Sequence, residues 1–152
     1  MAAKIDLGEL SLMAEKRLYL DYLAWSGNAP QFFSHHPLDF SAALKARREY
    51  PYPRAELSEL LGDYNANLGA AAATMDNIEA LSDPETFCVI GGQQAGFLGG
   101  PVYTCYKIIT AIRLARHLQA ELGLRVVPVF WLASEDHDFD EINHAHYLKS
   151  DG

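Results

Sequence analysis

Apolar residues recur at helical spacing through the first half of the chain. Residues 18–25 predict a short helix, and Gly27 ends it because glycine tolerates the left-handed conformation found after a helix. A second helix is predicted over residues 42–50. Asp39 or Ser41 can cap it, since both side chains accept hydrogen bonds from the backbone amides of a first helical turn.

The clearest helix of this half begins at Pro53, a residue favoured in a first helical turn. Its apolar positions form one stripe, which we expect to face a core. The stripe comprises Leu57, Leu60, Leu61, Tyr64 and Leu68. Gly69 predicts a break or bend before helical spacing resumes over residues 70–81, and one uninterrupted helix is the alternative.

The second half alternates short apolar runs with a long amphipathic segment. Residues 86–90 predict a buried strand that stops at Gly91, and residues 125–132 predict another. Because Pro128 cannot donate to a ladder, we expect the second strand to be bulged or to lie at an edge. Residues 102–122 predict a helix between the strands. Its apolar face comprises Cys105, Ile108, Ile109, Ile112, Ala115, Leu118 and Leu122, with Gly123 as a stop.

A strand, a crossover helix and a second strand predict a right-handed βαβ unit with parallel strands, the nucleus of a Rossmann-like sheet. We therefore expect an α/β chain with a helical segment over residues 1–84 and a first βαβ portion over residues 85–152. Residues 144–148 predict a third strand. So few strands leave an apolar edge, which favours an incomplete fold that pairs with the remainder of a longer chain or with a second copy.

Charge and composition exclude several classes of protein. The formal net charge is -8 and basic side chains do not cluster, so we expect no nucleic-acid partner. No apolar run reaches the roughly 18 residues of a membrane span, and the first residues include acids, so we expect a cytoplasmic protein without a membrane partner. Cys88 and Cys105 form neither a disulfide framework nor a zinc motif, and both are predicted to be small core residues.

A glycine-rich segment, residues 91–101, joins the first predicted strand to the long helix. Open α/β sheets bind ligands at this position. Glycine lets the backbone approach a phosphate or carboxylate, and the amides and dipole of the helix start favour an anion. Glutamine amides orient a ligand without adding charge. The candidate binding residues are Gly92, Gln93, Gln94, Gly96, Gly99, Gly100 and Pro101.

The glycine spacing matches no phosphate-binding fingerprint. It lacks Gly-x-Gly-x-x-Gly, and the Walker-type gap between Gly91 and Gly96 has no lysine after it. A tight turn, in which the glycines only permit chain reversal, is therefore the alternative. Tyr103 and Lys107 are two further candidates, one helical turn apart near the same loop. Lys107 can meet an anion there or lie in solvent on the outer face of the helix.

An acidic, histidine-containing segment, residues 134–144, follows the second predicted strand. Because the carboxyl ends of parallel strands meet at one edge of a sheet, we expect it to lie beside the glycine-rich segment. His137 can carry a proton while Asp136 or Asp138 stabilises its imidazolium. Further candidate binding residues here are Glu135 and Asn143.

Other uses of the acidic segment stay open. Its carboxylates can hold Mg²⁺ for a bound nucleotide. Asp140 and Glu141 can instead cap the next helix, where acids are favoured. His137, His144 and His146 match no zinc motif, so no protein metal site is predicted.

Two stretches of the sequence resemble one known family closely. They are residues 92–104 with Tyr106 and Lys107, and residues 128–144; residues 37–40 and 53–57 add supporting similarity. The family is the bacillithiol synthases, regarded as the cysteine-adding enzymes of bacillithiol synthesis and several times longer than this chain. The resemblance spans most of the sequence and implies a Rossmann-like core akin to that of nucleotidyltransferases.

The resemblance implies a ligase that joins cysteine to glucosaminyl-malate. Amide formation is uphill in water, so cysteine's carboxylate would first be activated, with ATP and Mg²⁺ as the expected cofactors. The glycine-rich segment would hold the anionic group, and His137, with Asp136 or Asp138, would take the proton from the attacking amine. This portion alone is expected to be inactive. A nucleotide-binding, anion-binding or partner-interaction domain without turnover is the second hypothesis.

Overall fold

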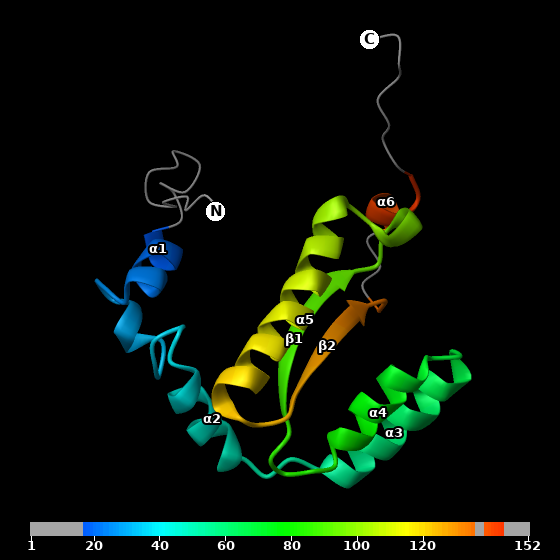
Figure 1. Ribbon diagram of the computed structural model, residues 1–152. Coiled ribbons are helices and arrows are strands. Elements are labelled where there is room, and N and C mark those ends of the chain that lie inside the picture. The colour runs from blue at the N-terminus through cyan, green and yellow to red at the C-terminus, as the bar shows by residue number, and fades with distance from the viewer. Residues whose placement is uncertain (1–16, 136–138, 145–152) are drawn as a thin grey trace. The chain divides into compact units, whose positions relative to one another are not determined.

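The computed structural model describes residues 17–135 and 139–144. Internal contacts divide the chain into two compact units, Met1–Pro51 and Tyr52–Gly152. The first contains α1 (Arg17–Ala24), the 3-10 turn η3 (Ala29–Gln31) and α2 (Phe40–Arg48). The second contains α3 (Arg54–Asn67), α4 (Ala72–Ala80), β1 (Phe87–Gln94), the 3-10 turn η4 (Phe97–Gly99), α5 (Val102–Leu122), β2 (Val126–Ala133) and α6 (Phe139–Ile142) (Figure 1). The division between the two compact units therefore places α3 and α4 with the strands. The boundary expected from the sequence, at residue 84, instead marks where helices give way to strands.

The predicted helices of the first half are present. Asp39 caps α2, since its carboxylate accepts a hydrogen bond from the Ala42 amide at 2.9 Å. Gly69 has a φ of 71° and separates α3 from α4, which confirms the predicted break. The expectation that the α3 stripe faces a core is wrong among the described residues, because Leu60 and Leu68 are each 67% exposed. Helical spacing identifies an apolar stripe but not the element that covers it.

Arg54 ties the end of α4 to the start of β1. Its Nη1 donates to the carbonyl oxygens of Leu81, Asp83 and Thr86 at 3.0, 3.0 and 3.1 Å. These carbonyls belong to a turn between a helix and a strand, where backbone groups need partners outside regular structure. One cation therefore fixes the direction in which the chain enters the sheet.

Substitution of Arg54 by methionine is expected to lower the free energy of unfolding by about 1.5–3 kcal/mol, the range for hydrogen bonds to a charged group. Arg116→Met, on an exposed position of α5, is the matched control and should change it by less than about 0.5 kcal/mol. Urea unfolding followed by circular dichroism measures both. Equal stability of the two variants would show that Arg54 does not hold the turn.

β1 and β2 form a parallel pair with an unbroken register from Phe87 opposite Val126 to Gln94 opposite Ala133, which confirms the predicted βαβ unit. The predicted stop of the first strand at Gly91 is wrong, because the strand continues to Gln94. Glycine has a low strand propensity, but the ladder with β2 overrides it here. Of the predicted third strand, His144 has no regular structure and residues 145–148 lie outside the described residues.

Pro128 pairs with Val89 without a bulge. The Phe87 amide donates to the Arg125 carbonyl at 3.0 Å, so alternate residues of β2 direct their backbone polar groups toward β1. Pro128 lies between those residues, and its nitrogen faces away from β1. It therefore removes no hydrogen bond from this ladder, and within the described residues β2 is an edge strand.

α5 packs along one face of the two strands (Figure 1). Its buried positions are Thr104, Ala111, Ala115 and Leu118. Ala111 lies opposite Gly91, where an added Cβ would be 3.9 Å from the alanine Cβ, so small residues let the helix approach the strand. Of the predicted apolar face, Ala115 and Leu118 are buried, whereas Ile109 is 51% exposed. The buried face is therefore rotated toward Thr104 and Ala111 relative to the predicted one. Among the helices of the described residues, none is long and apolar enough to cross a membrane.

The prediction that both cysteines are core residues is wrong, because Cys88 and Cys105 are exposed. Cys105 lies about a quarter turn round α5 from the buried Thr104. Cys88 lies on the face of β1 turned away from α5. Surrounding protein atoms nevertheless partly desolvate its thiol, and this raises the pKa of Cys88, with a smaller opposing effect from the Arg54 cation.

Candidate functional site

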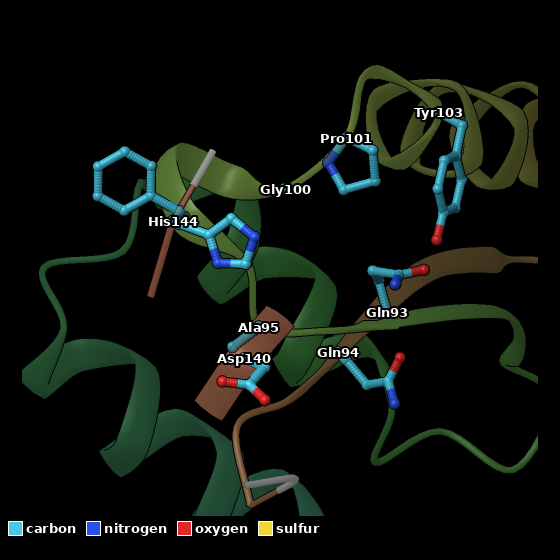
Figure 2. A pocket seen from close by; sticks show the side chains of 10 residues that line it. Gln93, Gln94, Ala95, Gly100, Pro101, Tyr103, Asp140 and His144 are labelled. Carbon is cyan, nitrogen blue, oxygen red and sulfur yellow. The ribbon is translucent and has the colours of Figure 1, made fainter. Parts of the chain in front are cut away.

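A pocket of about 610 Å³ lies where β1 ends and α5 begins (Figure 2). Its volume falls in the range of about 300–1,000 Å³ common for small-molecule sites. The walls come from the end of β1, the loop after it, the first turn of α5 and the α6 segment. The lining residues are Gln93, Gln94, Ala95, Gly96, Phe97, Gly100, Pro101, Tyr103, Asp140 and His144.

The two segments expected to share a cleft both contribute to this pocket. Figure 2 shows Asp140 and His144 with Gln93 and Gln94 around one space. Six predicted residues line it: Gln93, Gln94, Gly96, Gly100, Pro101 and Tyr103. Five other predicted residues are not in its lining: Gly92, Gly99, Lys107, Glu135 and Asn143. Asp136, His137 and Asp138 lie outside the described residues.

The glycines of the loop allow the chain to fold onto itself. A Cβ on Gly96 would lie 2.6 Å from the Cα of Gly100, which is closer than real contacts allow. Gly99 and Gly100 adopt φ values of 92° and 79°, in the region that favours glycine. These glycines therefore permit a tight chain reversal, and the same turn forms a wall of the pocket.

Gly96→Ala is expected to lower the free energy of unfolding by about 1–3 kcal/mol, because the added methyl group must displace backbone. Gly62→Ala is the matched control. Gly62 lies within α3 with nothing within 4 Å of an added Cβ, so its substitution should raise stability by about 0.5–1 kcal/mol. Urea unfolding measures both changes, and a destabilisation no larger at Gly96 than at Gly62 would contradict this account of the loop.

Lys107 lies beside two residues of the pocket lining. Its Nζ donates to Oε1 of Gln93 at 2.9 Å and lies 5.6 Å from the ring centroid of Tyr103. Both partners line the pocket. Lys107 is exposed but contacts two residues of the pocket wall.

A hydrogen-bonded chain links Asp140, Asn143 and His144. Nδ2 of Asn143 donates to Oδ1 of Asp140 at 3.4 Å, and Oδ1 of Asn143 contacts Nδ1 of His144. Because a carboxylate only accepts, the asparagine must present its nitrogen to Asp140 and its oxygen to His144. That oxygen also only accepts, so a hydrogen bond here requires the tautomer of His144 that has its proton on Nδ1.

Sequence reasoning missed Asp140 and His144 as pocket residues. It interpreted Asp140 as a helix cap and gave His144 no role outside a rejected zinc site. The spacing of Asp140, Asn143 and His144, three and four residues apart, is the signal that was available, because such residues share one side of a helical turn.

The described lining of the pocket combines one carboxylate with the start of a helix. Among the described residues, no three His, Cys, Asp or Glu side chains gather to hold a metal ion. Asp140 is the carboxylate that the described lining provides. Mg²⁺ is usually bound by one or two carboxylates together with substrate phosphates, so these residues fit Mg²⁺ only as the companion of a nucleotide. The first turn of α5 supplies amides with no partner inside the helix.

A parallel βαβ unit with its pocket at the carboxyl edge of the strands defines a Rossmann-like domain. The sequence matches the family described as "Bacillithiol biosynthesis BshC, N-terminal Rossmann-like domain" over residues 5–152. The chain belongs to this family, which confirms both the resemblance and the predicted fold class.

Three relatives carry the name "Putative cysteine ligase BshC". The protein of Bacillus cytotoxicus is 52% identical over 111 residues, covering 73% of this chain and 21% of the relative. That of Geobacillus thermodenitrificans is 41% identical over 151 residues, covering 97% and 28%. That of Anoxybacillus flavithermus is 46% identical over 142 residues, covering 93% and 26%. The chain therefore spans between 21% and 28% of the length of these relatives.

Proposed function

We propose that this chain is the N-terminal, ligand-binding part of a cytoplasmic ligase that adds cysteine to glucosaminyl-malate in bacillithiol biosynthesis. The names of the relatives support the reaction class. The observation that carries the proposal is the single pocket in which Gln93 and Gln94 meet Asp140 and His144. It combines donors for an anionic group with a residue able to accept a proton.

The proposed substrates carry the charge that this pocket can recognise. Cysteine and the malate group of the acceptor both present carboxylates. The glutamine amides and the first turn of α5 supply neutral donors to such groups. The Lys107 cation beside the wall favours an anion further, although the whole chain has a net charge of -8.

The activating cofactor we propose is ATP with Mg²⁺, which would supply the energy to activate a carboxyl group. The loop and the first turn of α5 would hold its phosphates, and Asp140 would contact the metal ion. Gln93 and Gln94 would orient the substrate carboxylate beside them.

The attacking amine must lose a proton as the amide forms. We assign that proton to Nε2 of His144, because Asn143 holds its Nδ1–H and Asp140 lies at the far end of the hydrogen-bonded chain. His137, assisted by Asp136 or Asp138, is the alternative acceptor predicted from sequence.

The reaction is tested in the full-length protein with cysteine, glucosaminyl-malate, ATP and Mg²⁺, with bacillithiol detected by mass spectrometry. The proposal predicts product that depends on all three substrates. Substrate binding without product would contradict it and support the second candidate, a binding or partner-interaction domain. The exposed apolar stripe of α3, which includes Leu60 and Leu68, favours that candidate. Calorimetry with ATP, malate and cysteine conjugates measures the binding separately.

A further inference from the structure

The packing of α5 on β1 determines which helical residue meets Gln93. Gly91 faces Ala111, and the next residue of β1 on the same face is Gln93. Two residues of strand span about 6.6 Å, close to the roughly 5.4–6 Å of one helical turn. One turn before Ala111 is Lys107, and the hydrogen bond between Lys107 and Gln93 follows from this match.

The chemistry of the two side chains fixes the direction of the amide. A lysine ammonium group only donates, so the atom of Gln93 that lies 2.9 Å from it is the amide oxygen. The amide nitrogen then lies on the side of the amide group away from Lys107, where its N–H donors can meet a ligand. Without Lys107, either atom of the amide can turn toward the pocket.

We propose that Lys107 is a positioning residue that holds the Gln93 amide with its N–H groups toward a carboxylate or phosphate bound in the pocket. This inference rests on the proposed function and names how its anion is recognised. Lys107 also stays 5.6 Å from the ring centroid of Tyr103, and this cation–π contact keeps a second wall residue in place.

Binding of L-malate and of ATP to the full-length protein, each measured by isothermal titration calorimetry, tests the role of Lys107. The malate titration reports a carboxylate source and the ATP titration a phosphate source. Lys107→Met should weaken the preferred ligand about 3- to 10-fold, the effect of losing one hydrogen bond. Lys107→Arg should stay within about twofold of wild type, because arginine also only donates. Arg113→Met removes a cation from an exposed position of the same helix, and its binding should also stay within about twofold of wild type.

Gln93→Glu separates amide direction from simple contact. The glutamate keeps a bond to Lys107 but presents an acceptor where the ligand needs a donor. Its binding should be about 10- to 100-fold weaker, as expected when a hydrogen bond to a charged group is lost. Selective ¹⁵N-glutamine labelling gives an independent readout, since the Gln93 side-chain amide signal should shift on ligand addition in wild type and less in Lys107→Met.

The outcomes distinguish this inference from the proposed function. If wild type binds neither malate nor ATP, both fail. If wild type binds and Lys107→Met binds equally well, the inference alone fails. If Lys107→Arg binds ligand as weakly as Lys107→Met, the lysine acts through general packing, and amide positioning is overturned. If Arg113→Met binds ligand as weakly as Lys107→Met, the effect is one of general charge, and amide positioning is again overturned.

Discussion

Replacing His144 by asparagine is expected to lower kcat for cysteine addition by the full-length protein about 10²–10⁴-fold, the typical contribution of a general base. Asparagine keeps a polar side chain but cannot accept the amine proton. KM for glucosaminyl-malate should change much less, because we propose that the glutamine amides and the first turn of α5 bind the substrate.

The control for this substitution is His117→Asn. His117 lies on α5, outside the pocket lining, and pairs with Glu121 at 3.2 Å on the surface, with its side chain 68% exposed. Its kcat should stay within about twofold of wild type. Steady-state kinetics with mass-spectrometric detection measures both variants. A His144→Asn enzyme that keeps more than about a tenth of wild-type kcat would contradict the assignment of the base.

His137→Ala is expected to lower kcat about 10- to 100-fold in the same assay, the size expected for one hydrogen bond to a charged group. The reason is its place in the sequence, between two acidic residues in the segment that follows β2. Activity within about twofold of wild type would exclude any such role. If kcat falls further in His137→Ala than in His144→Asn, the base is His137, as the sequence alone predicted.

The sequence predicted elements well where local signals were strong. The bounds of α5 match because Pro101 precedes it and Gly123, with a φ of 66°, ends it in the left-handed conformation. β1 was predicted too short because its glycines depend on pairing with β2, which local propensity does not describe. Burial of the α3 stripe likewise depends on the element that packs against it, and the spacing of apolar residues does not reveal that element.

The candidate site was predicted to the level of segments but not of side chains. Parallel strands bring their carboxyl ends to one edge, so the meeting of the two segments follows from topology. The contact of Lys107 with Gln93 depends on how the helix is placed along the strand, which is set by Ala111 opposite Gly91. The bond between Asn143 and His144 depends on the turn after α6, which spans only four residues.

A crystal structure of the full-length protein bound to glucosaminyl-malate tests most directly whether the end of β1 and the α6 segment form one anion-binding pocket. We expect a malate carboxylate within about 3 Å of the Gln93 amide nitrogen, on the side of the pocket that His144 faces. Ligand bound at a separate place, with Gln93 and His144 both remote from it, would contradict the account.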